Sequence, residues 1–178
     1  MQKTKCTAIV LAAGQGKRMG TKVQKQYLEI SGKPVLFYSL DVFQKSDMID
    51  DIILVVGENQ EEYCREEIIE KFHITKVRKI VKGGAERYHS VWNGLQEVAE
   101  DGYVFIHDGA RPFVTEEILS RAYETVQREK ACVVGMPVKD TIKIVDANGM
   151  VQNTPNRASL MAVQTPQCFK TTILSSAI

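Results

Sequence analysis

The 178-residue sequence has little of what disulfide-rich, metal-binding or membrane-spanning proteins need. Its cysteines lie far apart, without a C-x-x-C pair or metal-ligand spacing to the three histidines; they are Cys6, Cys64, Cys132 and Cys168. We therefore expect reduced and mostly buried thiols. The apolar run near the N-terminus spans only about eight residues, which is too short for a signal peptide or a membrane span. A cytoplasmic location is the default expectation, without a membrane as partner.

The sequence also lacks an excess of charge of either sign. Its 23 Lys and Arg residues against 22 Asp and Glu residues leave a net charge of +1. No long-range field therefore favours nucleic acid or a membrane surface as a partner, and an anionic ligand must be captured by local cations. With 44% hydrophobic and 25% charged residues, the composition indicates one soluble globular domain over residues 1–178.

Apolar runs of strand length alternate with helical patterns along most of the chain. Strands are predicted at residues 6–13, 52–56, 77–81, 103–106 and 132–138, and helices at residues 35–44, 58–72, 89–99 and 116–129. This alternation predicts a doubly wound α/β fold with a mostly parallel, Rossmann-like sheet. Ligand-binding residues are then expected in the loops at the carboxyl ends of the strands.

The pattern changes after Pro137. Two short strand-like segments flank the turn sequence Asp-Ala-Asn-Gly at residues 146–149, which predicts a protruding β-arm over about residues 138–160. The sequence stops within a predicted helix that starts at Thr171. We therefore expect the C-terminal end of the domain to be missing.

A glycine-rich segment, L-A-A-G-Q-G-K-R-M-G at residues 11–20, directly follows the first predicted strand. Glycines let backbone N–H groups approach phosphate oxygens closely, and Lys17 and Arg18 would neutralise their charge. The segment has no Gly-Lys-Ser/Thr of a P-loop, and its spacing G-x-G-x-x-x-G differs from the dinucleotide fingerprint. From this segment alone, a triphosphate-binding loop and a strand-to-helix turn without a ligand are both open interpretations.

Five sequence blocks in order make the interpretation specific. The glycine-rich segment, followed by K-Q-Y at residues 25–27, resembles the signature of the sugar-phosphate nucleotidyltransferases, whose fold is glycosyltransferase-A-like. The later blocks are G-G-A-E-R at 83–87, H-D-G-A-R-P at 107–112, P-V-K-D-T-I-K at 137–143 and Q-T-P-Q at 164–167. Together they resemble most closely the 2-C-methyl-D-erythritol 4-phosphate cytidylyltransferase family, over essentially the whole chain.

The resemblance implies that a cytidylyl group passes from CTP to 2-C-methyl-D-erythritol 4-phosphate with release of diphosphate, a step of non-mevalonate isoprenoid precursor biosynthesis. The attacking phosphate is already ionised, so no general base is needed and catalysis depends on positioning and charge stabilisation. The resemblance assigns Arg18 and Lys25 as the catalytic cations. It also implies Mg²⁺ or another divalent cation as cofactor, with Asp108 as a metal ligand.

The resemblance assigns further residues to the two substrates. The residues implied for the nucleotide are Ala12, Ala13, Gly14, Gln15, Gly16, Lys17, Gly83, Gly84, Ala85, Ser90 and Gly109. The residues implied for the sugar-alcohol phosphate are Asp108, Arg111, Thr141, Arg157 and Thr165. Because the arm crosses to a second subunit in the family, a homodimer with composite sites is expected. His107, on a buried strand, is expected to be structural.

Two positions depart from the family pattern. Gln24 stands where a proline usually precedes the lysine, and Ala85 stands where an aspartate is common. Without the proline ring we expect a less stiff loop, in which Lys25 is positioned only when the nucleotide binds. Without the aspartate, the base would be recognised by backbone groups.

Other functions remain open from the sequence. A ribitol 5-phosphate cytidylyltransferase shares several of the blocks. A chain without the C-terminal end could also be a CTP-binding or dimerisation module without turnover. A dehydrogenase is the weakest alternative, because the dinucleotide fingerprint is absent.

Overall fold

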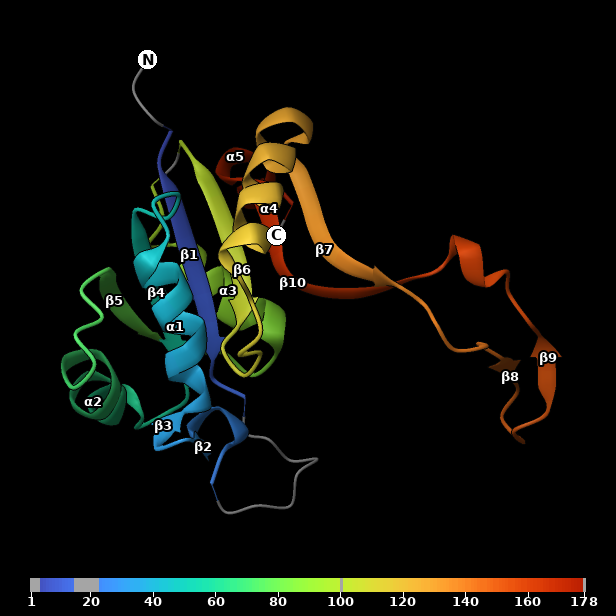
Figure 1. Cartoon of the computed structure of the whole chain (residues 1–178), viewed down its shortest axis with the longest axis horizontal. Helices are drawn as coiled ribbons and strands as arrows, with labels where there is room; N and C mark the ends of the chain where they lie inside the picture. The colour runs from blue at the N-terminus through green and yellow to red at the C-terminus, as the bar shows by residue number, and fades with distance from the viewer. Residues whose placement is uncertain (1–3, 15–22, 100, 178) are drawn as a thin grey trace.

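The computed structural model describes residues 4–14, 23–99 and 101–177 (Figure 1). Its main sheet has the strand order β5-β4-β1-β6-β10-β7. The strands are Cys6–Ala12 (β1), Asp51–Val56 (β4), Val77–Lys82 (β5), Tyr103–Asp108 (β6), Ala131–Pro137 (β7) and Met161–Lys170 (β10). The first four of these in sheet order are parallel, and β10 runs antiparallel to both β6 and β7. The predicted α/β fold with a mostly parallel sheet is therefore confirmed.

The helices follow the predicted alternation, with changes at their ends. They are Val35–Lys45 (α1), Glu61–Cys64 (α2), the π-helical continuation Arg65–Glu70 (η3), Arg87–Leu95 (α3), Glu116–Glu129 (α4) and Thr171–Ser175 (α5). Helix α3 begins two residues earlier than predicted, because Glu86 and His89 form a capping box at its N-terminus. None of the helices within the described ranges is long and apolar enough to cross a membrane.

The central strands are buried on both faces. On β1, Ala8 and Val10 face the larger apolar cluster, which is covered by α1, α2 and α4. The intervening Ile9 faces a smaller cluster, which includes side chains of α3 and α5. A parallel strand covered on both faces reads as a continuous apolar run, which explains the sequence of β1. The four cysteines are thiols, and only Cys132 is not fully buried, as predicted.

Strand β10 was not predicted. It pairs with both β6 and β7, and its register with β7 shifts between Val163 and Gln167. Pro166 lies in this shift and cannot donate a ladder hydrogen bond. In a sequence, a proline within an apolar run argues against a strand. In this structure the irregular register accommodates the proline.

The chain between β7 and β10 forms an arm that extends far from the body (Figure 1). Its hairpin consists of Ile144–Val145 (β8) and Val151–Asn153 (β9). The Asp146 carboxylate closes the turn, since it accepts hydrogen bonds at 2.9 Å from the N–H groups of Asn148 and Met150. The arm predicted after Pro137 is present, with shorter strands than the sequence indicates.

The strand order indicates where a ligand would bind. The chain leaves β1 toward β4 on one side and later returns to pair β6 on the other. The crevice at such a reversal, outside the carboxyl ends of the strands, is where doubly wound proteins bind ligands. Ala12, Val56, Lys82 and Asp108, the last residues of the four parallel strands, meet at this edge.

Candidate active site

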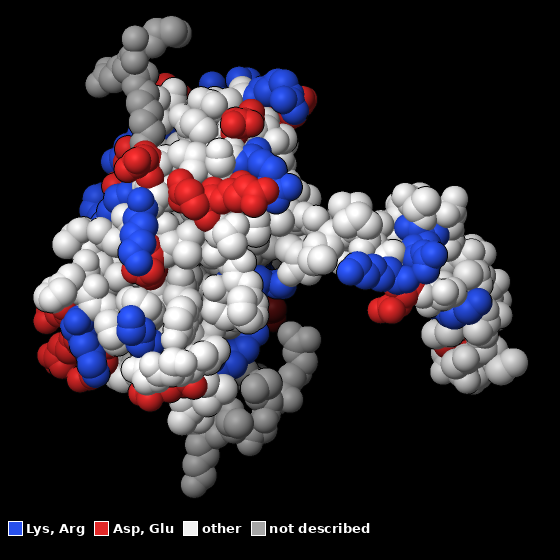
Figure 2. All heavy atoms as spheres, viewed as in Figure 1, with Lys and Arg blue, Asp and Glu red and all other residues white. Residues whose placement is uncertain are grey.

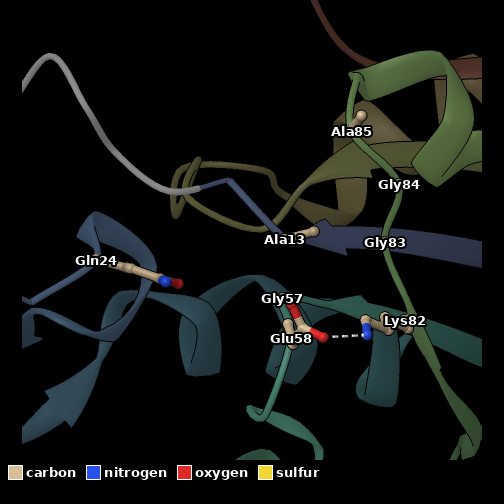
Figure 3. A pocket seen from close by; sticks show the side chains of 8 residues that line it. All are labelled: Ala13, Gln24, Gly57, Glu58, Lys82, Gly83, Gly84 and Ala85. Atoms are coloured by element: carbon tan, nitrogen blue, oxygen red, sulfur yellow. Dashed lines mark hydrogen bonds and ion pairs between the residues drawn. The ribbon is translucent and has the colours of Figure 1, made fainter.

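A cleft of about 310 Å³ lies at the carboxyl ends of β1, β4 and β5 (Figure 3). It is lined by Ala13, Gln24, Gly57, Glu58, Lys82, Gly83, Gly84 and Ala85. Half of these residues were predicted to bind the nucleotide, namely Ala13, Gly83, Gly84 and Ala85. The structure therefore brings the first and second sequence blocks together around one cavity, whose size suits part of a small ligand.

The glycine turn after β5 packs directly against the end of β1. A Cβ atom at Gly83 would lie 2.3 Å from the Ala13 Cβ and 2.9 Å from the Ser90 Oγ, so only glycine fits. The buried Ser90 hydroxyl accepts a hydrogen bond at 3.1 Å from the Gly84 N–H. Ser90 thus supports the turn that walls the cleft, and its predicted direct contact with the nucleotide stays a prediction.

An ion pair that no sequence motif indicates lies beside this turn. The Lys82 Nζ lies 2.6 Å from a Glu58 carboxylate oxygen (Figure 3). Their hydrogen bond lowers the pKa of Glu58 and raises the pKa of Lys82, so both groups are charged at neutral pH. The two residues are 24 positions apart and belong to no motif, so no local pattern could have paired them.

The predicted catalytic Lys25 lies on a short 3₁₀ turn, Lys25–Tyr27 (η2), and is exposed. The next residue, Gln26, is buried, and its side chain connects this turn to the end of β1. Its Nε2 donates to the carbonyl oxygens of Ala12 at 2.6 Å and Gly14 at 3.0 Å. Four predicted residues lie outside the described ranges: Gln15, Gly16, Lys17 and Arg18.

At the end of β6, the Asp108 carboxylate joins two guanidinium groups. Its Oδ1 accepts from the Nε of Arg87 at 3.1 Å, and its Oδ2 accepts from the Nε of Arg111 at 3.0 Å. Burial alone would raise the pKa of Asp108, but the hydrogen bond from Arg111 and the charge of Arg87 outweigh it and lower the pKa. Arg87, in the second sequence block but without a predicted role, is thus part of the site.

Behind Asp108, buried hydrogen bonds hold the H-D-G-A-R-P loop in place. The Thr165 hydroxyl lies 2.9 Å from the His107 Nδ1 and 3.3 Å from the Asp108 N–H, and the His107 Nε2 lies 3.1 Å from the Arg111 carbonyl oxygen. Burial lowers the pKa of His107 to about 4, so the ring is neutral at neutral pH. The structure agrees with a structural His107. The Thr165 hydroxyl belongs to the same buried hydrogen-bond network. A contact of Thr165 with the substrate therefore stays a prediction.

Gly109 lies in a crowded position beside the end of β1. Its N–H donates to the Leu11 carbonyl oxygen at 2.8 Å, and an added Cβ would lie 2.7 Å from the Leu36 Cδ1. The loop is therefore attached to the end of β1 by a main-chain hydrogen bond. Because its N–H is already bonded, contact between Gly109 and a nucleotide stays a prediction.

The comparisons with known proteins agree with this geometry. The family described as 2-C-methyl-D-erythritol 4-phosphate cytidylyltransferase matches residues 6–178. The chain belongs to this family. The cytidylyltransferase of Lachnospira eligens is 49% identical over 171 residues, covering 96% of this chain and 75% of the relative. The one of Alkaliphilus metalliredigens is 50% identical over 175 residues, covering 98% and 73%.

Solved structures show the same fold. A crystal structure of a 4-diphosphocytidyl-2C-methyl-D-erythritol synthase from Anaerococcus prevotii superposes with a TM-score of 0.85 at 32% identity, covering 98% of this chain and 73% of that one. The 2-C-methyl-D-erythritol 4-phosphate cytidylyltransferase from Francisella tularensis gives a TM-score of 0.78 at 27% identity, covering 98% and 76%. The sheet with its arm is therefore the fold of this cytidylyltransferase family.

Two residues that are predicted to bind the sugar-alcohol phosphate lie on the arm, apart from the cleft of their own chain. Thr141 precedes β8, and Arg157 begins a short 3₁₀ turn, where its guanidinium donates at 2.7 Å to the Lys139 carbonyl oxygen. Figure 2 shows basic side chains gathered on the arm, whose cationic residues are Lys139, Lys143 and Arg157. The structure of one chain thus does not bring Thr141 and Arg157 to Asp108 and Arg111.

Asp108 is the carboxylate that the resemblance assigns to a divalent cation. They contain no group of three or more His, Cys, Asp or Glu side chains that could hold a metal ion. Both Asp108 oxygens are bonded to guanidinium groups, but a carboxylate has about four acceptor sites, so Oδ2 retains one for a cation. This fits Mg²⁺ only where phosphate oxygens and water supply the other ligands, as is usual for that ion.

Proposed function

We propose that this chain transfers a cytidylyl group from CTP to 2-C-methyl-D-erythritol 4-phosphate and releases diphosphate. The observation that carries the proposal is the cleft at the strand ends, in a chain of this family. Its lining includes Gln24, the neighbour of Lys25, and the glycine turn that continues to Arg87, the partner of Asp108. The relatives named above act on methylerythritol phosphate by name, which favours this substrate over ribitol 5-phosphate.

The reaction needs no base from the protein. An oxygen of the substrate phosphate attacks the α-phosphorus of CTP, a new P–O bond forms, and the bond to the β-phosphate oxygen breaks. The buried imidazole nearest the site, His107, is neutral and bonded at both nitrogens, so it is not placed to take a proton. The rate enhancement then comes from aligning the two phosphates and stabilising charge on the leaving diphosphate, the tasks of Arg18 and Lys25.

The cytosine base of CTP would lie in the cleft against Ala13 and the glycine turn. Because Ala85 has no polar side chain, the backbone at Gly84 and Ala85 would recognise the base edge. The substrate phosphate would lie toward Arg111, whose guanidinium suits bidentate phosphate binding. Asp108 holds this guanidinium and that of Arg87 in place through two ion pairs.

A divalent cation, Mg²⁺ by preference, is part of the proposal. When bound, it would neutralise triphosphate charge, with the free acceptor site of the Asp108 Oδ2 as its protein ligand. The four cysteine thiols support a reducing compartment, and we propose the cytoplasm as the location, which cell fractionation would test.

A homodimer is also proposed, with each arm completing the site of the other subunit. Two features support it: Arg157 lies on the arm far from the cleft of its own chain, and the arm exposes large apolar side chains. They include Ile144, Val145, Met150 and Val151, each at least half exposed. Such side chains are usual in interfaces between subunits.

The test combines ligand selectivity with one substitution. Thermal stabilisation should be largest with CTP and Mg²⁺, compared with UTP, ATP and GTP, and diphosphate release should require methylerythritol phosphate. Lys25→Ala should lower turnover by about 10²-fold, as loss of one transition-state donor does. Lys45→Ala, at an exposed pair with Asp41, is the matched control and should leave turnover unchanged. Turnover with ribitol phosphate instead, or an unaffected Lys25→Ala variant, would refute the proposal.

A further inference from the structure

Gln26 is a polar side chain buried where an apolar one would be ordinary. Only 1% of it is exposed. Its Nε2 donates to the carbonyl oxygens of Ala12 at 2.6 Å and Gly14 at 3.0 Å, and to the Gln24 Oε1 at 2.8 Å. Burying an amide costs free energy unless its hydrogen bonds are made, so these contacts determine where the side chain can lie.

The contacts of Gln26 join two parts of the proposed site. Ala12 and Gly14 belong to the end of β1 and the start of the glycine-rich segment, whereas Gln24 and Lys25 lie ten or more positions later in the sequence. An amide nitrogen has two hydrogens, and here three oxygens share them. Displacing η2 relative to the end of β1 would therefore break bonds at a buried group.

The turn η2 has a separate anchor on its other side. The Tyr27 hydroxyl lies 3.3 Å from the Cys64 Sγ of α2, and its ring packs edge-on against Tyr63 at 5.2 Å. The Tyr27 N–H also donates to the Gln24 carbonyl oxygen at 2.9 Å. Tyr27 thus attaches the turn to the body, while Gln26 sets its position relative to the end of β1.

We propose that Gln26 is a positioning residue for Lys25. By holding η2 against the Ala12 and Gly14 carbonyls, it sets the distance between the Lys25 ammonium group and the start of the phosphate-binding segment. The inference rests on the proposed function, in which Lys25 stabilises charge in the transition state. The inference also concerns the position where the family usually has a proline. In this chain Gln24 stands there, and its side chain is hydrogen-bonded to Gln26.

The expected effect follows from the sensitivity of catalysis to geometry. A displacement of about 1 Å in a catalytic group can cost on the order of 10²-fold in rate. Gln26→Met keeps the length and much of the volume of the side chain but removes both donors. It should lower kcat by about 10- to 100-fold and change the CTP dissociation constant by less than about 3-fold, because Lys25 acts mainly in the transition state.

A matched control and a double variant separate positioning from general stability. Tyr27→Phe, in the same turn, removes the hydrogen bond to Cys64 but not the link to β1, and should leave kcat within about 2-fold. Gln26→Met should add less than about 3-fold in a Lys25→Ala background, because residues that act through one group are not additive. Circular dichroism and the CTP dissociation constant show whether each variant is folded.

The outcomes are distinguishable. If Lys25→Ala turns over normally, the proposed function fails. If Lys25→Ala is impaired but Gln26→Met is not, or if Gln26→Met is equally costly in both backgrounds, only the positioning role is overturned. Should Gln26→Met fail to fold, Gln26→Asn retains the amide on a shorter side chain. A folded Gln26→Asn variant with wild-type kcat would overturn the inference. A reduced kcat would support it if the same substitution lowers kcat by less than about 3-fold in a Lys25→Ala background.

Discussion

Neighbouring residues of the H-D-G-A-R-P block perform different tasks because they lie at the end of a strand. His107 points into the core, where it packs edge-on against Phe43 at 5.3 Å, whereas Asp108 emerges at the sheet edge between Arg87 and Arg111. Successive side chains of a strand point to opposite faces, so one motif supplies both the buried support and the charged group.

The buried His107 predicts a dependence of stability on pH. Its pKa falls from 6.5 to about 4 on folding, so the unfolded chain binds a proton more readily between these values. The contribution to stability is complete above about pH 6.5 and is lost as the pH falls toward 4, an effect of about 3 kcal/mol. Urea unfolding at about pH 7.5 and about pH 4.5 should show this loss.

His107→Gln is the test variant, because its amide can still donate toward the Arg111 carbonyl but does not titrate. It should show a smaller loss of stability over the same pH interval. The pKa values of Asp51 and Asp108 are also lowered, but these carboxylates take up protons only at more acidic pH. They therefore contribute little to the loss of stability between about pH 7.5 and about pH 4.5. An equal loss of stability in the wild-type protein and in His107→Gln would mean that other groups are responsible.

At the scale of elements, the site is built from short turns between strands and helices. The β5–α3 turn runs from Lys82 to Arg87, and α3 is capped by Glu86 within it. The Gly83 N–H donates to the Val56 carbonyl oxygen at 2.8 Å, which extends the β4–β5 pairing into the turn. The wall of the cleft is therefore fixed to β4 by a main-chain hydrogen bond and to the start of α3 by the capping box.

Gly83→Ala should distort this wall. The added Cβ would lie 2.3 Å from the Ala13 Cβ, so the turn must move away from β1. We expect CTP affinity, measured by calorimetry, to fall by about 10-fold or more, a loss of at least about 1.4 kcal/mol. Gly135→Ala in β7, whose Cβ would meet nothing closer than 3.4 Å, is the control and should bind CTP normally. Unchanged affinity of Gly83→Ala would place the nucleotide elsewhere.

The elements also show which patterns can be interpreted locally. Helix α4 has the predicted bounds, because its apolar spacing and the Thr115 cap, which accepts from the Ile118 N–H at 3.3 Å, are local. The predicted helix at residues 58–72 is different: it begins at Glu61 and becomes π-helical at Arg65. Apolar periodicity indicates that a helix exists but does not specify its hydrogen-bond pattern.

At the scale of the whole molecule, the arm separates residues that the family resemblance assigns to one site. Lys25 and Arg111 lie on the body, and Arg157 lies on the arm (Figure 1). In a two-fold symmetric dimer, an arm that reaches the partner also receives the partner's arm. Each site would then combine the body of one subunit with the arm of the other.

Mixing two inactive variants tests this arrangement. Lys25→Ala lacks a body residue and Arg157→Ala lacks an arm residue. In a mixed dimer, one site would carry both substitutions and the other neither, so equal mixing with free exchange should restore about a quarter of wild-type activity. Diphosphate release measured before and after mixing is the assay. Each variant incubated alone is the control, and no recovery despite dimer formation would mean that the arm serves its own chain.

By itself, the sequence determined the alternation of strands and helices, the arm after Pro137 and the ordered blocks that identify the family, because each depends on residues close together in the chain. Only the tertiary structure decided the place of β10, the pairing of Arg87 with Asp108 across 21 positions, and the link from Gln26 to the end of β1. These contacts join segments through the sheet, and no local periodicity encodes which distant segment a buried polar group will meet.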